Sequence, residues 1–345
     1  MRTDKVDLKS LTQDQLESFL AEMGKEKYRA KQILRWIYQR NAHNFDQMTD
    51  LAKPFRMQLD ERAYISHWSP ETVAQSSDGT RKYLFRLDDG ESVEAVRIPM
   101  EDQRATLCIS TQVGCAMGCQ FCMTGTFGLK RNLRPEEIVN QVCAALEDGP
   151  ISNIVLMGMG EPLHNFDHVT TALEILYLDD GLGYGTRRVT LSTCGLVPQI
   201  RQLAQKIKVQ LAVSLNATTD EIRNRLMPIN QRYPLAELIA ACRDYAQESR
   251  QRVTFEYILI SGVNDSLADA KRLVKLLHGV RCKVNLIAYN EHEASLFKAP
   301  DETSVKAFQS YLLQRDLVAT LRASRGQDIA AACGQLKGQL DCRDQ

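Results

Sequence analysis

Three cysteines, Cys115, Cys119 and Cys122, stand in a C-x3-C-x2-C array within eight residues, and this array constrains the chain more than any other feature. Three thiolates this close together suit a cubic [4Fe-4S] cluster, because each binds one iron and the fourth iron stays open to a small molecule. Gly114 and Gly118 allow the backbone to turn sharply beside the metal. The sequence therefore predicts an iron-sulfur site with one open coordination position.

Two other uses of these cysteines compete with the cluster. A structural zinc ion usually takes four protein ligands, and no other Cys or His lies near Cys122 to complete the set. Disulfides are disfavoured because the opening residues, MRTDKVDLKS, lack the basic and then apolar pattern of a secretory signal. We therefore expect a reducing, cytoplasmic location and a cluster, with zinc as the main alternative.

An aromatic residue, Phe121, precedes the last cysteine, and the array resembles that of the radical S-adenosylmethionine (SAM) enzymes. Further motifs follow in order along the chain: MGMGEP, LMPIN, GVNDS and DIAAACGQL. Together they resemble the RlmN/Cfr family of RNA adenosine methyltransferases, from about residue 10 to 340. Several independent motifs in one order make chance agreement improbable.

Apolar strand patterns alternate with helical patterns through most of the chain. Strands are expected at 105–109, 153–158, 187–194, 209–216, 252–260 and 283–290. Continuously apolar strands separated by helices indicate a parallel sheet covered on both faces, and six such units suit a partly closed barrel. The resemblance implies the same α/β fold, a partial (β/α)6 radical SAM barrel. A last strand at 317–322 leads into the segment that carries Cys333.

Three parts of the chain are expected. Residues 1–75 are predicted to form a small helical accessory domain that contacts RNA, and residues 76–103 a linking β-hairpin that turns at Asp89-Gly90. Residues 104–340 are predicted to form the barrel and the C-terminal segment with Cys333. Within the first part, the helical stretch 25–40 carries six Lys or Arg residues, which either bind phosphate or form an ordinary solvated face.

The charge balance limits how the chain can bind RNA. Its 43 basic residues are matched by 43 acidic residues, so bulk charge does not attract nucleic acid and an RNA site must be a local patch. Candidates to hold flanking phosphates are Lys130, Arg131, Arg322 and Arg325, with solvated surface residues as the alternative reading. No run of about 18 apolar residues occurs, so no membrane contact is expected.

Polar residues follow the predicted strands, at the edge where ligands of such sheets collect. The resemblance implies that Gly160 and Glu161 hold the amino group of SAM. The other SAM-binding residues implied by the resemblance are Ser192, Ser214, Leu215, Asn216 and Asn290. Relatives commonly carry histidine where Asn216 stands, which leaves that contact open.

Two further cysteines and one carboxylate complete the expected site. By sequence alone Cys108 and Cys333 are ordinary core cysteines and Glu94 is a strand residue facing solvent. The resemblance implies instead that Cys333 carries the methyl group, that Cys108 resolves the intermediate, and that Glu94 is the proton acceptor. The segment between Pro99 and Cys108 resembles the family with one inserted residue, which leaves Glu91 as a weaker candidate.

The resemblance implies a two-SAM reaction. One SAM methylates Cys333, and a second, bound at the open iron, yields a 5'-deoxyadenosyl radical that activates this methyl for addition to adenine. Glu94 then removes the ring proton, and Cys108 attacks Cys333 to release methylated RNA and a disulfide that external thiols reduce.

The sequence favours the branch of the family that methylates carbon 2 of an adenosine in 23S rRNA, and in many members one next to the tRNA anticodon. The alternatives are the carbon-8, resistance-conferring branch and, more remotely, a radical SAM activase of another protein or an RNA-binding module with a structural metal. We expect a monomer that receives electrons from flavodoxin or ferredoxin and is reset by a thiol reductant.

Overall fold

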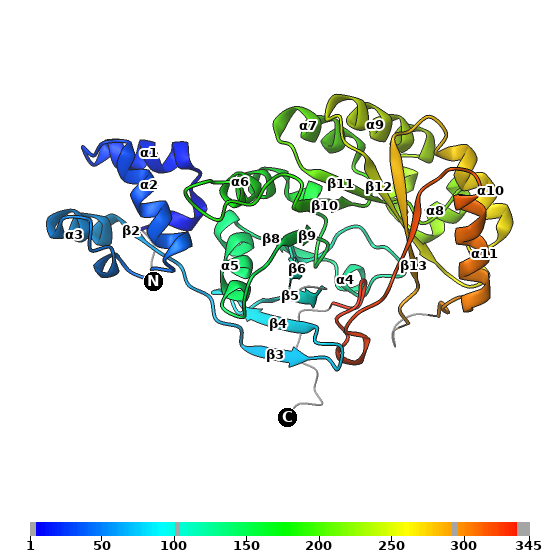
Figure 1. Ribbon diagram of the computed structural model, residues 1–345, viewed down its shortest axis with the longest axis horizontal. Helices are drawn as coiled ribbons and strands as arrows, with labels where there is room; N and C mark the ends of the chain where they lie inside the picture. Colours follow the sequence, from blue (N-terminus) through cyan, green and yellow to red (C-terminus); the bar gives the residue numbers. More distant parts are fainter. Residues whose placement is uncertain (1–4, 101–103, 292–295, 337–345) are drawn as a thin grey trace.

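The computed structural model describes residues 5–100, 104–291 and 296–336. A ten-stranded mixed sheet, in the order β14-β13-β12-β11-β10-β9-β6-β5-β4-β3, forms its centre. Figure 1 shows a helical bundle, coloured blue, at one end of the molecule and the sheet with its helices beside it.

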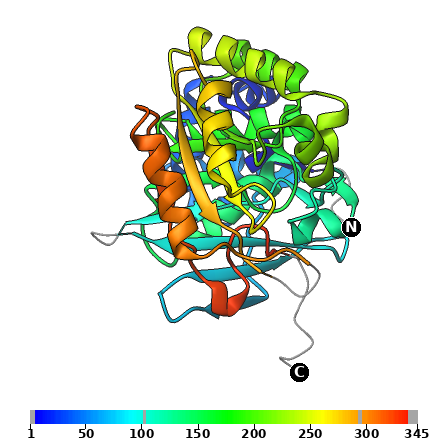
Figure 2. The ribbon, with the colours of Figure 1, turned by 90° about the vertical axis from the view of Figure 1, so that its right-hand side faces the viewer.

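The parallel part of the sheet confirms the expected partial barrel. Each of its strands pairs in parallel with the next. The strands are β6 (Ala105–Cys108), β9 (Asn153–Leu156), β10 (Val189–Thr193), β11 (Gln210–Ser214), β12 (Val253–Leu259), β13 (Cys282–Ala288) and β14 (Ala319–Arg322). The helices between them are α5 (Pro135–Leu146), α6 (Phe166–Leu176), α7 (Val197–Lys206), α8 (Asp220–Leu226), α9 (Leu235–Glu248), α10 (Leu267–Leu276) and α11 (Glu302–Leu313). Figure 2 shows α10 and α11, yellow to orange, on the outside of the strands.

Alternation along the strands separates an apolar layer from a polar interior. Leu211, Val213 and Phe255 are fully buried in the main hydrophobic core. Their neighbours Ser214 and Glu256 line a hollow inside the barrel. Each buried apolar side chain contributes roughly 1.5–3 kcal/mol, so the outer layer stabilises the fold and leaves the inner face available for chemistry.

The expected hairpin forms, but it is part of the sheet and not only a linker. Strands β4 (Arg81–Arg86) and β5 (Ser92–Pro99) are antiparallel, and β5 pairs directly with β6. Strand β3 (Thr72–Gln75) pairs with β4. The boundary expected at residue 75 therefore differs from the structure, because the sheet already begins at β3.

The N-terminal bundle has a hydrophobic core of its own, formed by residues between Leu8 and Ile65. Its elements are β1 (Val6–Asp7), the 3-10 helix Leu8–Ser10, α1 (Gln13–Glu22), α2 (Tyr28–Leu34), the π-helical turn Arg35–Gln39, the 3-10 helix Phe45–Gln47, α3 (Lys53–Arg62) and β2 (Ala63–Tyr64). Thr12 and Gln15 form a capping box that starts α1. The helix expected over 25–40 is thus α2 continued by a π-helical turn.

Basic residues of α2 and the π-helical turn hold this bundle against the barrel. Arg35 and Lys31 reach Asp180, which follows α6, with N–O distances of 2.7 and 3.6 Å. Tyr38 and Leu178 pack at the same seam. Two cations of the basic stripe, for which phosphate binding and a solvated face were both open, therefore pair with Asp180 while their side chains stay exposed.

The C-terminal segment crosses the antiparallel strands and returns to the cysteine loop. The Asp328 carboxylate accepts hydrogen bonds from Ser76 Oγ at 2.5 Å and from the Ser77 backbone N–H at 3.0 Å. Further on, the Gly334 carbonyl accepts from the Met123 N–H at 2.7 Å. Cys333 is thereby held between the sheet and the loop. Figures 1 and 2 both show this red segment next to the cyan strands.

The described residues include no helix with the length and apolar character needed to traverse a bilayer.

Replacing Asp328 with alanine should loosen the C-terminal segment while the barrel stays folded, because the carboxylate loses its three hydrogen bonds from Ser76 and Ser77 in the β3–β4 turn. Trypsin should then cut after exposed Arg325 several-fold faster. Asp244→Ala on the exposed face of α9 is the matched control and should leave the cleavage rate unchanged. Equal rates in both variants would show that Asp328 does not anchor the segment.

Candidate functional site

A short antiparallel ribbon encloses the cysteine loop. Strands β7 (Gln112–Gly114) and β8 (Leu129–Asn132) pair at its base. Gly114 has φ +75°, and a Cβ atom there would lie 1.9 Å from the Gly128 carbonyl oxygen. The loop can close only with glycine at this position, which explains the residue in front of the first cysteine.

The three cysteines of the array are half-buried and line one hollow of ≈ 150 Å³. Burial raises the pKa of the Cys115 thiol to about 12. Burial, and then the neighbouring thiols, also raise the pKa of Cys119 well above its usual range. Thiols crowded in this way favour a bound metal cation, because the cation stabilises the thiolate form.

The spacing of the sulfurs distinguishes a cluster from a single ion. Among the described residues, the only trio of metal-ligating side chains with all donor atoms within 4.8 Å is His43, His67 and Glu147. At least one pair of the cysteine sulfurs is therefore more than 4.8 Å apart, which is wider than the ~3.8 Å that tetrahedral Zn–S bonds of about 2.3 Å would require. The array fits a multi-iron cluster in which each thiolate binds its own iron.

The expected amino-group site lies in the same hollow. Gly160 has φ +99°, and a Cβ there would lie 2.5 Å from Gln112 Cβ. The buried Glu161 carboxylate accepts from the Cys194 N–H at 2.7 Å and from the Leu163 N–H at 3.0 Å. Burial nevertheless raises the pKa of Glu161. A buried carboxylate held in this way is prepared to receive an ammonium group.

The other expected SAM-binding residues divide into two groups. Ser192 and Ser214 line the hollow beside the cysteines. Leu215 and Asn216 do not line it; the Asn216 side chain accepts from the Ile258 N–H at 2.9 Å and packs against Met227. Asn290 lines the adjacent hollow and donates to the Cys333 carbonyl at 3.3 Å. The structure thus gives Asn216 and Asn290 contacts with the protein itself.

Cys108 and Cys333 line this adjacent hollow, which has a volume of ≈ 280 Å³. It shares Cys122, Met157 and Arg322 with the first hollow. Burial, followed by the neighbouring Cys333, raises the pKa of the Cys108 thiol to about 12. Both thiols are free. Residues distant in sequence therefore meet within reach of the cysteine loop.

Arg322, a phosphate-clamp candidate in the sequence, lines both hollows inside the site. Negative charge at Cys333 is the main cause that raises the Arg322 pKa, and Glu256 and Cys108 add to it. Glu256 is 5 % exposed and lines the first hollow. Its Oε1 accepts from Asn285 at 2.9 Å, whereas its Oε2 is buried without a hydrogen-bond partner. Strand alternation could have indicated Arg322 and Glu256 as site residues, since both side chains lie on the same inner face of the sheet as Ser214.

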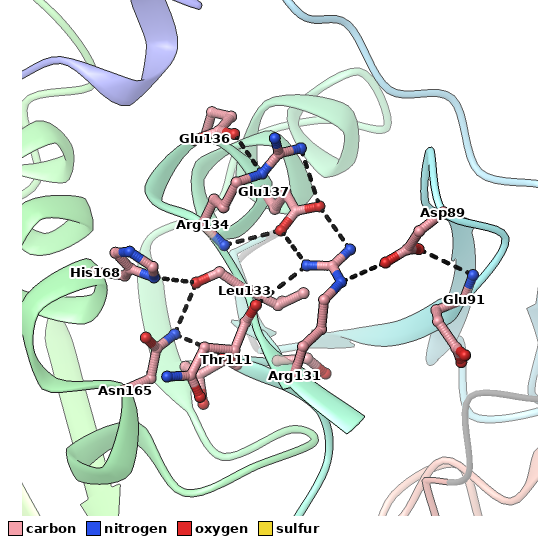
Figure 3. Close-up of polar contacts among 12 residues, drawn as sticks. Asp89, Glu91, Thr111, Arg131, Leu133, Arg134, Glu136, Glu137, Asn165 and His168 are labelled. Carbon is pink, nitrogen blue, oxygen red and sulfur yellow. Dashed lines mark hydrogen bonds and ion pairs between the residues drawn. The ribbon is translucent and has the colours of Figure 1, made fainter. Parts of the chain in front are cut away.

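Two other clamp candidates have carboxylate partners. Lys130 lies 2.8 Å from Glu91. Arg131 joins Asp89 of the hairpin to Glu137 of α5, at 2.8 Å for the Glu137 contact. Figure 3 shows the Arg131 guanidinium between these two carboxylates. Arg131 therefore ties the hairpin to the barrel, while Arg325 stays exposed at the rim of the second hollow.

The two candidate bases occupy different environments. Glu94 is 1 % exposed and lies 3.1 Å from Lys82 Nζ, which corrects the expectation of a solvent-facing side chain. It shares a face of β5 with Val96, the partner of Cys108 in β6. Glu91 is in the hairpin turn, paired with Lys130. Neither carboxylate lines the two hollows, but only Glu94 projects from the Cys108 face of the sheet.

Sequence reasoning missed Arg223, a fully buried guanidinium in α8. It donates to the carbonyls of Leu215 at 3.0 Å, Cys194 at 2.7 Å and Ser214 at 3.1 Å, and to Asn230 Oδ1 at 3.0 Å. These acceptors follow or end β10 and β11, so Arg223 fixes the strand ends that carry the site. A lone Arg in an amphipathic helix gives no sequence signal for such a role.

Known proteins resemble this chain over nearly its whole length. Residues 6–65 match the family "Ribosomal RNA large subunit methyltransferase N-terminal domain" and residues 109–275 match the "Radical SAM superfamily". The "Dual-specificity RNA methyltransferase RlmN" of Syntrophotalea carbinolica is 65% identical over 97% of this chain and 91% of its own, and that of Geobacter sulfurreducens is 59% identical over 97% and 93%. A crystal structure of a radical SAM methyltransferase from Sphaerobacter thermophilus superposes with a TM-score of 0.91 at 47% identity, covering 97% of this chain and all of that one.

Replacing Arg223 with lysine should destabilise the fold by about 2–4 kcal/mol, because an ammonium group cannot reach all the acceptors that the guanidinium satisfies. Urea unfolding with the metal retained measures the loss. Exposed Arg225 in the same helix supplies the control, Arg225→Lys, which should change stability by less than ~0.5 kcal/mol. Similar stabilities for the two variants would contradict the role given to Arg223.

Proposed function

The chain belongs to the RlmN family of dual-specificity RNA methyltransferases, and we propose on this basis that it methylates carbon 2 of an adenosine in 23S rRNA and of an adenosine next to a tRNA anticodon. It is a radical SAM enzyme that uses SAM and a [4Fe-4S] cluster. The observation that carries the proposal is the meeting of Cys108 and Cys333 in a hollow that adjoins the cysteine loop.

We assign Cys115, Cys119 and Cys122 to the cluster and Gly160, Glu161, Ser192 and Ser214 to SAM. The cluster, when bound, supplies the electron that makes SAM a source of radicals. Glu161 receives the amino group, since its buried carboxylate would otherwise lack a cationic partner. Asn216 and Leu215 support the pocket through backbone contacts and hydrogen bonds.

Cys333 is the proposed methyl acceptor and carrier. Its position is held by the bond from Asn290 to its carbonyl and by the loop contact of Gly334. Arg322 lines the same hollow as Cys333, and the Cys333 sulfur is the proposed nucleophile that displaces a methyl group from a sulfonium. Glu256 interacts electrostatically with this guanidinium.

Cys108 and Glu94 act after the carbon–carbon bond has formed. Glu94 accepts the proton from the adenine ring, and the radical adduct gives up one electron, which the bound cluster would take back. Cys108 then attacks the Cys333 sulfur; the sulfur–carbon bond breaks toward carbon, which takes up a proton and becomes the methyl group of the released base, and a Cys108–Cys333 disulfide remains. The raised pKa of Cys108 means that this thiol must lose its proton as it attacks, beside Arg322. An external thiol then reduces the disulfide.

Several features outside the reaction centre belong to the same proposal. Reduced flavodoxin or ferredoxin is the proposed electron donor, and the enzyme is proposed to act as a monomer in the cytoplasm, where free thiols persist. The N-terminal bundle, residues 5–65, is proposed to contact RNA with the cations that Asp180 does not engage.

Anaerobic reconstitution with iron, sulfide, SAM and a reductant on unmodified RNA tests the function. Mass spectrometry should find 2-methyladenosine in both rRNA and tRNA fragments. Cys333→Ala should abolish methylation while the iron content and the visible absorption of the cluster stay normal; Cys242→Ala, in a buried cysteine of α9, is the control. Formation of 8-methyladenosine would assign the other branch of the family, and turnover by Cys333→Ala would remove the thiol carrier.

Glu94 and Glu91 can be separated by parallel substitutions. Glu94→Gln should stop turnover after the base is attached and should accumulate a ribonuclease-sensitive protein–RNA adduct, because the ring proton cannot leave. Glu91→Gln removes only a surface ion pair and should reduce turnover less than about twofold. Adduct in Glu91→Gln and normal turnover in Glu94→Gln would reverse the assignment.

A further inference from the structure

A second cavity, of ≈ 740 Å³, lies at the opposite end of the barrel and is strongly basic. Its cations are Arg187, Lys208, Arg250, Arg252, Arg281 and Lys283. The other lining residues are Thr186, Gln210, Ser249 and Gln251, so no carboxylate and no aromatic ring lines it among the described residues. We call this cavity the basic mouth.

The basic mouth lies far from the reaction centre because the two sites are at opposite ends of the same parallel strands. Its residues precede or begin β10, β11, β12 and β13, whereas Ser192 and Ser214 lie near the carboxyl ends of β10 and β11. At about 3.3 Å per residue, the seven residues of β12 separate the two ends by roughly 20 Å. The site is therefore distinct from the SAM and thiol hollows.

The cations of the basic mouth have no close carboxylate partner among the described residues, although Lys283 interacts with Glu256 over a longer distance. None of the six forms an ion pair within 4.0 Å in the described ranges, although Lys130, Arg131 and Arg134 elsewhere on the barrel all do. All but Lys283 are exposed. The whole chain has no net charge, so this is a local concentration of positive charge. Water and salt screen these exposed cations in part, and a bound polyanion would lower their mutual repulsion further.

The arrangement fits a chain of phosphates better than a single anion. Adjacent strands lie about 4.8 Å apart, so cations on four neighbouring strand starts form a row roughly 14 Å long. Arg250 and Arg281 are joined within it, since Arg281 Nη1 donates to the Arg250 carbonyl at 2.9 Å. A row of this length spans several successive phosphates of a nucleic-acid strand, which carry one charge per ~3.4 Å of helix axis.

We propose that the basic mouth binds the phosphodiester backbone of the substrate RNA at a point remote from the reacting adenosine. The contact is independent of sequence, because the described lining offers cations and amides but no ring on which a base could stack. It anchors a large RNA to the face opposite the catalytic one. This inference rests on the proposed RNA substrate.

The test is equilibrium binding of unmodified 23S rRNA fragments and tRNA to the anaerobically reconstituted full chain between 50 and 300 mM salt. Arg187→Gln/Lys208→Gln/Arg252→Gln should weaken binding about tenfold or more at low salt and lower the slope of log K against log[salt] by about 2–3. Arg281→Gln/Lys283→Gln is a second, independent variant and should lower the slope by about 1–2. Iron content and SAM binding should stay at wild-type levels in both.

Arg243→Gln/Lys271→Gln/Lys275→Gln removes three cations from the outer helices and should leave affinity and slope unchanged. Wild-type affinity and slope in both basic-mouth variants would overturn the inference, while methylation by the wild-type chain would still uphold the proposed function. Inorganic tripolyphosphate is the second arm. If it binds the wild-type chain tightly but not the variants, and RNA affinity is equal in all of them, the cavity is a small-polyphosphate site and the RNA contact is refuted.

Discussion

Parallel pairing of the barrel strands is the constraint on which the rest of the structure depends. It brings the carboxyl ends of β9, β10 and β11 to one edge, where Glu161, Ser192 and Ser214 face the cysteine loop. The same pairing brings the amino ends, with their lysines and arginines, to the opposite edge. Strand alternation then keeps the apolar core outside and the reactive side chains inside.

The second determinant is the path of the C-terminal segment. It leaves β14, crosses the antiparallel strands and returns to the cysteine loop, so that Cys333 comes to share a hollow with Cys108. Hydrogen bonds hold it, including those of Asp328 with Ser76 and of Gly334 with Met123, and Ala331 and Leu336 also pack into the main hydrophobic core. Polar and apolar contacts together therefore set the position of Cys333.

Buried charge is concentrated around the site, and most of it is satisfied by hydrogen bonds there. Arg223 has four hydrogen bonds to fixed acceptors, and Glu161 accepts two backbone N–H bonds. Glu256 and Arg322 lie together at the thiols, with one Glu256 oxygen still without a partner. Burying these groups costs stability, and such groups are typical of a site that binds charged ligands.

The sequence by itself determined the α/β barrel and the hairpin and predicted the cluster ligands, because each rests on local spacing or periodicity: apolar strands between helices, a turn at Asp89-Gly90, and cysteines within eight residues. It indicated the roles of Cys333, Cys108 and Glu94 only through family resemblance, since nothing local distinguishes them from core residues.

Only the tertiary structure decided that Arg322 faces the thiols and that Arg131 and Arg35 form ion pairs with other parts of the protein. It alone also showed that Arg223 ties the strand ends together and that six cations from four strand starts form one mouth. These relations join residues distant in the chain, and a side chain's partner across such distances depends on strand order and register, which no local pattern encodes.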